Sequence, residues 1–188
     1  MCVNGGWFHD LTAAAKYGRD GAKKKQRQED RKAKRELLEN DYRHQIKETQ
    51  KAFNELVRLL DSGKPCICCG RPTDGKPVDC GHFLSRGSHP ELRFCFHNAY
   101  GQLTSCNRGG EKYKGRQHTT RQGFEQGITD RYGSEVLEWL TGPHALVKWT
   151  IDELKQMRAM YRAEIRYIEK FGKPSRDWRQ FPPLEQAA

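Results

Sequence analysis

The chain has 188 residues and a formal net charge of +10, with 35% hydrophobic and 31% charged residues. So little apolar material cannot enclose a large core, and we expect extended helices and a bound metal to supply part of the stability. No apolar run reaches the ~18 residues of a membrane span, and the mean hydropathy is −0.96. The N-terminus lacks the apolar stretch of a signal peptide, which predicts a cytoplasmic protein with reduced thiols. Basic chains of this kind (pI about 9.3) most often bind nucleic acid.

The first segment, residues 1–35, is predicted to be a basic N-terminal arm. Most of the net positive charge of the chain falls in its second half. Such a segment is expected to be solvated or disordered in the free protein, because it has little apolar surface to bury. On nucleic acid it would neutralise phosphates and make binding strongly salt-dependent. The residues that we assign to this contact are Lys23, Lys24, Lys25 and Arg27.

The next segment, residues 36–64, is predicted to be mostly helical. Apolar side chains recur at three- and four-residue steps over residues 36–60, and Gly63 and Pro65 follow the end of the pattern. The apolar stripe is expected to pack on the core of the domain. Alternatively it packs on the same helix of a homodimer partner, although the stripe is short for a coiled coil.

A second helical region is predicted over residues 119–170. Within it, Thr150 and Glu153 have the spacing of a capping box, in which each residue satisfies a free backbone N–H of the other. This signal predicts a helix that starts there and continues to about Lys170. The prolines that follow predict an extended C-terminal tail over residues 171–188.

The cysteines gather in the middle of the chain. There are seven in total, and their clustering in a reducing compartment favours a metal site over disulfides. Cys66-x-x-Cys69 has the spacing of a zinc knuckle, in which both sulfurs reach one ion at about 2.3 Å, and Cys106 is the predicted third thiolate. The alternative is a pair of buried or redox-active thiols, but the thioredoxin-like pattern that would surround a redox pair is missing.

Two candidates for catalysis, one acidic and one basic, lie between these cysteines. Residues 77–84 are predicted to form a strand that carries Asp79 and His82, and residues 92–96 to form the second strand of the hairpin. Two strands and a following helix beside a zinc site are the layout of a ββα-metal, or HNH, nuclease. The sequence therefore predicts an α+β, mainly α fold, with a zinc-stapled ββα centre over residues 65–118 flanked by long helices.

In that layout each side chain would have a part in phosphodiester hydrolysis. Neutral His82 would accept a proton from the attacking water. Asp79 would help hold a Mg or Mn ion that stabilises the leaving 3′ oxygen. Asn98 would hold the hairpin and orient His82 through a hydrogen bond, and His118 or Asn107 would complete the metal site. Each residue type also has a plainer role, since Asp and Asn often cap turns and helices and histidine is common in surface loops.

Basic residues flank the predicted site. They would hold phosphates on either side of the cut, unless they only form a solvated surface. No recognition helix for base edges stands out, so selectivity would come from the shape of a DNA branch. These residues are Arg86, Arg93, Arg108, Lys112, Lys114 and Arg116.

Five short stretches, in their order and spacing, resemble the NinG (Rap) family of lambdoid phage recombination endonucleases. They are Pro65-Cys-Ile-Cys-Cys69-Gly, Asp79-Cys-Gly-His82, Leu92-Arg-Phe, Cys106-Asn107 and Trp149-Thr-Ile. The resemblance covers roughly residues 34–169. It implies an endonuclease that cleaves branched recombination intermediates, of the Holliday junction or D-loop type, with a divalent metal in the cytoplasm of a bacterial host. It also makes phage recombination proteins candidate partners.

The chain departs from the family pattern in three places. The first cysteine of the family's second Cys-x-x-Cys falls at Leu103, which leaves zinc with three thiolates. The histidine or asparagine that usually follows the Cys-Asn pair has no clear match, and the N-terminal extension of longer members is short here. The candidates for the fourth zinc ligand are Cys95 and His97, followed by Cys68 and Cys80 with less suitable geometry.

These patterns predict a structure-selective DNA endonuclease. The main alternative is a zinc-knuckle DNA-binding protein without catalysis, in keeping with the missing family residues. A sequence-specific HNH homing or restriction enzyme is disfavoured, because no second recognition domain is evident. Symmetric cutting of a four-way junction would suit a homodimer.

Overall fold

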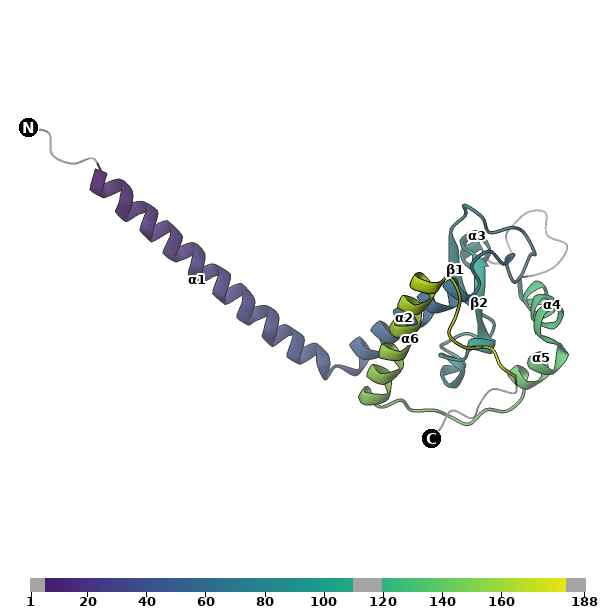
Figure 1. Ribbon diagram of the computed structural model, residues 1–188. Coiled ribbons are helices and arrows are strands. Elements are labelled where there is room, and N and C mark those ends of the chain that lie inside the picture. Colours follow the sequence, from purple (N-terminus) through teal and green to yellow (C-terminus); the bar gives the residue numbers. More distant parts are fainter. Residues whose placement is uncertain (1–5, 110–119, 182–188) are drawn as a thin grey trace, which may run out of the picture. The chain divides into compact units, whose positions relative to one another are not determined.

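The chain forms two units, Met1–Gln45 and Ile46–Ala188. A computed structural model describes the backbone of residues 6–109 and 120–181, and the side chains of residues 21–108 and 120–181. Among the described helices, none combines the length and apolar character needed to cross a membrane. The first unit consists mainly of helix α1, and the second holds a small sheet with helices around it (Figure 1).

Helix α1 spans Gly6–Glu39, where the sequence predicted an arm without regular structure. The side chains of residues 21–36 are all exposed, so the arm is solvated as expected, but it is helical. Local propensity explains the difference, because Lys, Arg, Gln, Glu and Ala are all good helix formers. The helix also gains contacts four residues apart, such as the hydrogen bond from Gln26 to Asp30 at 2.9 Å.

The predicted helix over residues 36–60 is divided in two. Helix α1 ends at Glu39, and helix α2 runs over Tyr42–Leu60. Asp41 causes the break, because its Oδ1 accepts a hydrogen bond from the backbone N–H of His44 at 3.0 Å and so caps the start of α2.

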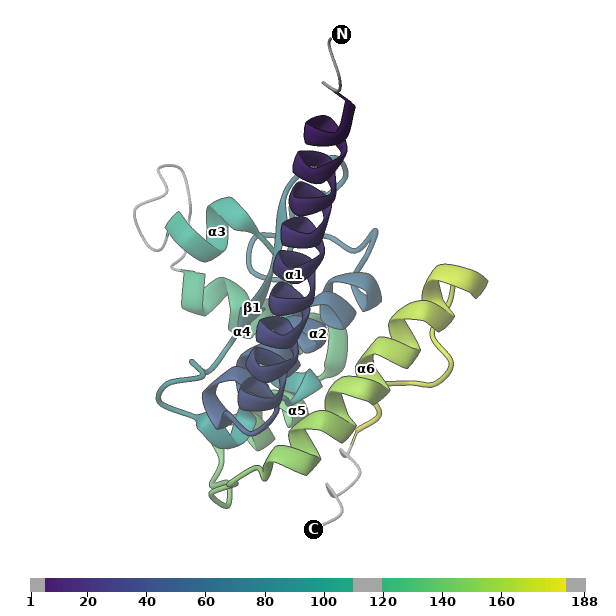
Figure 2. The same ribbon diagram turned by 90° about the vertical axis from the view of Figure 1, so that its left-hand side faces the viewer.

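Helix α2 packs against helix α6, Ile151–Phe171, as the sequence predicted (Figure 2). Phe53 is fully buried and its ring centroid lies 5.6 Å from that of Tyr161. The hydroxyl of Thr49 donates to the carbonyl of Leu154 at 2.8 Å, which fixes the two helices against each other. The predicted capping box is also confirmed, because the Thr150 and Glu153 side chains both make their reciprocal bonds to the backbone.

The sheet has two antiparallel strands, β1 over Val78–His82 and β2 over Ala99–Leu103. The prediction of β1 is confirmed, but the prediction of a second strand at residues 92–96 is wrong. That part of the chain forms two 3-10 turns, η1 over Pro90–Leu92 and η2 over Phe96–Asn98. Short apolar runs do not by themselves distinguish strands from other buried segments. Strand β2 was missed because it is buried on both faces and contains glycine and glutamine, which are not typical of strands.

Three further helices surround the sheet. Helix α3, Thr104–Gly109, follows β2 directly, so that two strands and a short helix come in the expected order. Helix α4, Thr120–Tyr132, and helix α5, Ser134–Thr141, pack together and bury Phe124, Ile128 and Leu140 against the sheet side of the core. Both helices fall within the helical region that was predicted over residues 119–170.

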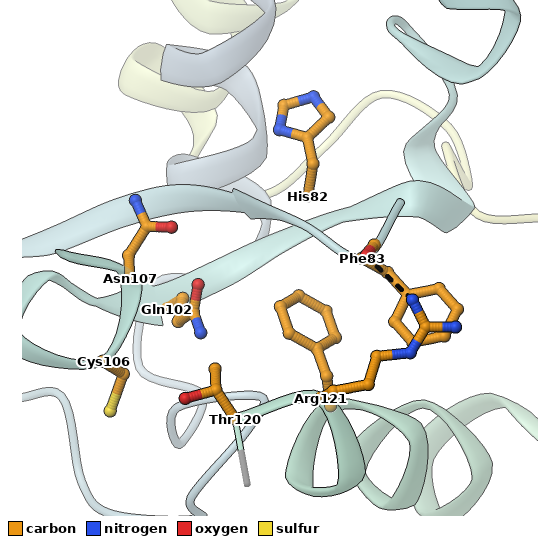
Figure 3. Close-up of a pocket in the computed structure, with 8 residues that line it drawn as sticks. His82, Phe83, Gln102, Cys106, Asn107, Thr120 and Arg121 are labelled. Carbon is orange, nitrogen blue, oxygen red and sulfur yellow. Dashed lines mark hydrogen bonds between the residues drawn. The ribbon is translucent and has the colours of Figure 1, made fainter. Parts of the chain in front are cut away.

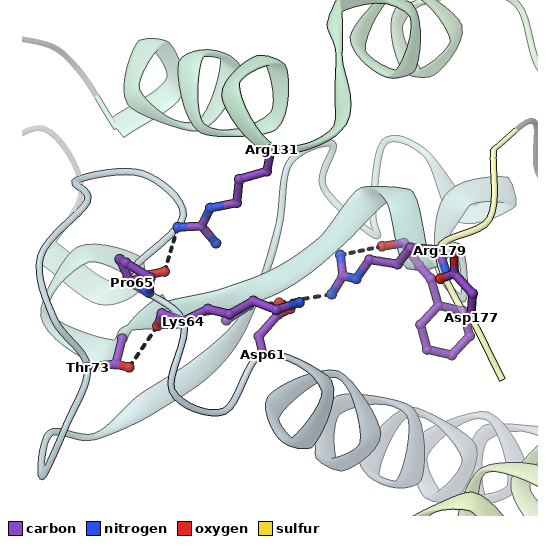
Figure 4. Close-up of polar contacts among 9 residues, drawn as sticks. Asp61, Lys64, Pro65, Thr73, Arg131, Asp177 and Arg179 are labelled. Atoms are coloured by element: carbon purple, nitrogen blue, oxygen red, sulfur yellow. Dashed lines mark hydrogen bonds and ion pairs between the residues drawn. The ribbon is translucent and has the colours of Figure 1, made fainter. Parts of the chain in front are cut away.

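The described part of the C-terminal tail is attached to the core. Arg179 is 9% exposed, and its guanidinium donates to Asp61 Oδ2 at 2.9 Å and to the carbonyl of Phe96 at 2.9 Å (Figure 4). The same carboxylate oxygen of Asp61 accepts from the N–H of Gly101 at 2.8 Å. One buried ion pair therefore joins the end of α2, strand β2 and the tail, which the sequence predicted to be merely extended.

Replacing Arg179 by methionine should destabilise the protein markedly. The change keeps most of the side-chain volume but removes the buried guanidinium partner of Asp61, so that Lys64, at 3.0 Å, is left to balance the charge of this carboxylate. Removing one partner of a buried ion pair typically costs about 3 kcal/mol. The free energy of unfolding, measured by urea denaturation, should fall by that amount. The control is Lys173→Met on the exposed part of the same tail. A loss below ~1 kcal/mol for the Arg179 variant would show that the ion pair contributes little.

Candidate functional site

Four cysteines come together at the edge of the sheet. The sulfur atoms of Cys66, Cys68, Cys69 and Cys106 all lie within 4.8 Å of one another. Those of Cys66 and Cys68 are 3.7 Å apart, and those of Cys69 and Cys106 are 3.6 Å apart. A tetrahedral zinc ion with Zn–S bonds of about 2.3 Å holds its sulfurs about 3.8 Å apart. The group therefore has the composition and the dimensions of a structural zinc site.

Hydrogen-bond donors surround these sulfurs. The N–H of Leu103 donates to Cys66 Sγ at 3.3 Å, and the amide of Gln102 donates to Cys68 Sγ at 3.2 Å. The guanidinium of Arg71 reaches two sulfurs, Cys69 at 3.3 Å and Cys106 at 3.6 Å. Donors of this kind stabilise negative charge on metal-bound thiolates. They were not predicted, because no local sequence signal links Arg71 or Gln102 to the cysteines.

The acid–base properties of the cysteine thiols also favour a bound cation. The hydrogen bond from Cys68 lowers the pKa of Cys66 to about 4, and the same contact raises the pKa of Cys68. Negative charges this close repel each other, so without a cation the sulfurs cannot all be ionised. A zinc ion removes this conflict because it stabilises every thiolate that it binds.

The structure corrects the choice of the fourth ligand, because Cys68 occupies the position for which Cys95 or His97 was favoured. Cys95 lies in the buried turn before η2, where burial raises the pKa of its thiol to about 11. His97 is buried too, and its Nε2 lies 3.1 Å from the carbonyl of Gln180. Both residues sit on the side of the core that receives the C-terminal tail. Cys80 faces the cluster formed by α2 and α6 and is also outside the four-sulfur group.

Helix α4 lies directly against the backbone of the cysteine loop. A Cβ atom added at Gly123 would be 2.0 Å from the carbonyl oxygen of Cys68, and one added at Gly127 would be 1.9 Å from that of Ile67. The two glycines are four residues apart and so occupy one face of the helix. Only a helix without side chains on this face can approach the loop so closely.

We therefore expect Gly127→Ala to destabilise the protein, although the same change usually stabilises a helix by up to ~1 kcal/mol. The added methyl would push the loop away from α4, at a cost of about 2 kcal/mol, and would loosen the metal site. Thermal unfolding and zinc content check both effects. Gly87→Ala is the control, since its nearest neighbour would be at 4.0 Å. Unchanged melting of the Gly127 variant would contradict the close packing.

Asp79 lies on β1 opposite Gln102 and faces helix α3. Its Oδ2 accepts hydrogen bonds from Asn107 at 3.1 Å and from Arg108 at 3.3 Å. Partial burial alone would raise the pKa of Asp79, but the hydrogen bond from Asn107 and the charge of Arg108 hold it below its ordinary value. The carboxylate is therefore ionised at neutral pH, and Asn107 is placed beside it as one of the two predicted partners.

His82 lies at the end of β1, partly buried, with its ring centroid 6.1 Å from that of Phe53. Its Nε2 is 3.1 Å from the carbonyl of Arg93. Because a carbonyl can only accept, Nε2 carries the proton in this contact and Nδ1 is the nitrogen able to accept one. Burial lowers the pKa of His82 to about 4, although the carbonyl of Arg93 opposes this shift. The ring is therefore neutral at physiological pH, as a general base must be.

Asn98 is fully buried and holds the loop between the strands, but it does so without touching His82. Its Oδ1 accepts from the N–H of Leu84 at 2.8 Å, and its Nδ2 donates to the carbonyls of Leu84 at 3.0 Å and Leu92 at 3.2 Å. The predicted direct hydrogen bond to His82 is replaced by this indirect support. Since Leu92 precedes Arg93, Asn98 fixes the segment whose carbonyl contacts the His82 ring.

An open pocket of about 250 Å³ lies between the sheet, α3 and α4 (Figure 3). In Figure 3 the His82 ring lies on the opposite side of the strand from Gln102 and Thr120 and points away from them. Arg121, which was not predicted, stacks over Phe83 at 3.7 Å and is paired with Glu125 at 2.8 Å. The lining residues are His82, Phe83, Gln102, Cys106, Asn107, Thr120, Arg121 and Phe124.

The predicted basic residues are dispersed. Arg86 is exposed in the loop after β1, and Arg93 donates to the carbonyl of Arg86 at 3.3 Å, while Arg108 is exposed but paired with Asp79. The lysines and the arginine assigned to the arm are exposed on α1, in the first unit, and stay a prediction as DNA contacts. Four of the predicted residues lie outside the described part of the chain: Lys112, Lys114, Arg116 and His118.

The fold and the site define a mainly helical α+β protein with a four-cysteine cluster, suited to a metal ion, beside a two-stranded sheet. The chain belongs to the NinG family, because the family model described as Bacteriophage Lambda NinG protein matches residues 9–171. This confirms the resemblance seen in the sequence.

Curated relatives are proteins named ninG. That of Escherichia phage lambda is 30% identical over 123 residues, which are 64% of this chain and 55% of the relative. That of Salmonella phage P22 is 29% identical over 123 residues, with 64% of this chain and 56% of the relative covered. The chain thus spans about half the length of the curated relatives it matches. No solved structure matches it significantly.

Proposed function

We propose that this chain is a structure-selective DNA endonuclease. Its substrates would be branched recombination intermediates of the Holliday junction or D-loop type, and the reaction would be metal-dependent hydrolysis of a phosphodiester. The observation that carries the proposal is the state of His82, a residue next to an open pocket whose imidazole is neutral and has one nitrogen bonded to a backbone carbonyl. This arrangement leaves Nδ1 as the proton acceptor and fixes the orientation of the ring.

In the proposed reaction Nδ1 of His82 accepts a proton from the water that attacks phosphorus. Asp79, ionised and oriented by Asn107, would hold a Mg or Mn ion together with substrate oxygens, as is usual for Mg sites in nucleases. When bound, that ion would stabilise the charge on the leaving 3′ oxygen. The four-cysteine cluster would hold zinc and fix β2 and α3 relative to the loop, without taking part in the reaction.

A second function is favoured by one observation. The Asp79 carboxylate is already bonded to Asn107 and paired with Arg108, which is what a purely structural aspartate would do. If this contact persists on DNA, the protein would be a zinc-stabilised DNA-binding accessory protein without catalysis.

The test is incubation of the full chain with labelled four-way junctions and with linear duplex of the same sequence. Mg or Mn is supplied in one series and a chelator in the other. We expect paired nicks in the junction only when the divalent metal is present, and little cutting of the duplex. Binding of the junction without cutting in either metal would instead support the accessory protein.

A further inference from the structure

Helix α6 carries a row of basic residues that the site does not use. They follow one another at steps of three, four, four and four residues, so they lie along a single face of the helix. The residues are Lys155, Arg158, Arg162, Arg166 and Lys170. The first two are half-buried and the others are exposed.

This row has no compensating partners within the part of the chain that the structure describes. The side chains of Arg158, Arg162 and Arg166 make neither an ion pair nor a hydrogen bond there. Like charges four residues apart destabilise a helix by roughly 0.2–0.5 kcal/mol per pair. A run of such pairs therefore opposes the fold, and a ligand with negative charges would relieve the repulsion.

The helix that carries this basic row is held firmly in place. The apolar face of α6 is anchored by Leu154, Tyr161 and Ile165, which are at most 6% exposed and pack on α2. Figures 1 and 2 show α6 along the outside of the second unit, next to α2. Residues four apart on a helix are separated by about 6 Å along its axis, so the row extends over about 22 Å. A ligand for it must carry regularly repeated negative charge over a similar length.

We propose that this row binds the phosphate backbone of a DNA duplex. A duplex carries one negative charge per about 1.7 Å of its axis, so several phosphates fall within the length of the row. An acidic protein would need a matching linear array of carboxylates. The inference rests on the proposed function for the identity of the ligand, but it concerns a surface on α6 that lies outside the pocket and its flanking loops. This surface would hold an arm of the branched substrate.

The experiment compares two triple variants of equal net charge. The first, Arg158→Gln with Arg162→Gln and Arg166→Gln, removes the centre of the row. The second, Lys76→Gln with Lys148→Gln and Lys173→Gln, removes three exposed charges elsewhere in the second unit. The affinity for a four-way junction is measured by fluorescence anisotropy between about 50 and 200 mM salt with a chelator, so that no cleavage occurs. Thermal unfolding verifies that both variants are folded.

Each phosphate contact that is lost lowers the slope of log affinity against log salt by about 0.9. If each of the three arginines contacts one phosphate, the row variant should lose about 2.7 from the slope and bind at least ~10-fold more weakly at 100 mM salt, whereas the slope of the control should fall by less than about 0.5. Equal effects of the two variants, or none, would overturn the inference. A wild-type chain that binds but never cleaves would refute the nuclease alone, because the slopes would still report on α6.

Discussion

Replacing His82 by alanine is expected to abolish cleavage of four-way junctions while leaving their binding nearly unchanged. A positioned general base contributes about 10²–10⁴-fold to a rate, so the single-turnover rate should fall by at least 10²-fold. The affinity measured in a chelator should change less than about 2-fold, since the ring contacts Arg93 and Phe53 rather than an exposed phosphate-binding surface. Equal loss of cleavage and binding would contradict a role in proton transfer.

A neighbouring histidine provides the control for this variant. His89 is half-buried in the loop after β1, and its Nδ1 contacts Glu91 at 3.1 Å. His89→Ala should therefore retain cleavage. Zinc content and thermal unfolding must be the same for both variants, so that a rate difference is not caused by unfolding.

The pH dependence gives an independent measurement. Because burial lowers the pKa of His82 to about 4, the free enzyme keeps its base neutral well below the ordinary titration of histidine. The cleavage efficiency should thus not fall between about pH 7 and pH 5.5 through protonation of this ring. The same lowered pKa also determines how the stability of the protein depends on pH. The unfolded chain binds more protons between pH 6.5 and about 4, so this group contributes stability above that range and loses it as the pH falls.

Loss of the metal site is expected to have the largest effect on stability. Cys66→Ser should reduce the zinc content from about one ion per chain to nearly none, because the hydroxyl is a poor ligand and the remaining sulfurs repel each other. The melting temperature should fall by at least ~10 °C, which corresponds to about 3 kcal/mol for a domain of this size. Atomic emission spectroscopy measures the zinc content, and thermal unfolding measures the melting temperature.

Two other cysteines distinguish the arrangement of ligands. Cys68→Ser should lose zinc in the same way as Cys66→Ser, because its sulfur belongs to the four-sulfur group. Cys95→Ser should keep the ion, although burying a hydroxyl lowers stability by about 1–3 kcal/mol. Retention of zinc by the Cys68 variant together with its loss from the Cys95 variant would restore the ligand set expected from the sequence.

The sequence was most informative where the signals were local. The Thr150 capping box and the strand with Asp79 and His82 depend on neighbouring residues, and their positions were predicted closely. The Cys66-x-x-Cys69 spacing indicated a metal site for the same reason. Cys68 was ranked below Cys95 and His97 as the fourth ligand because its geometry looked less suitable, and only the folded loop brings its sulfur together with the other three.

Features that depend on distant residues could not be predicted. Arg179 and Asp61 are 118 positions apart, and nothing near either residue indicates the other. The same holds for Arg71 and Cys106, which are 35 positions apart. The helical arm shows the converse case, because its charge suggested disorder while its individual residues favour helix.

The distribution of the sulfurs along the chain has a consequence for the order of folding. Three of them, at Cys66, Cys68 and Cys69, come from four consecutive residues, whereas Cys106 is 37 positions beyond Cys69. Closing a loop of that length carries an entropic penalty that the short stretch avoids. During synthesis the three neighbouring thiols leave the ribosome before Cys106, so they would be the first ligands available to an ion. Cys106 would then be the last ligand to bind, and it would connect the start of α3 to the loop that holds the other three cysteines.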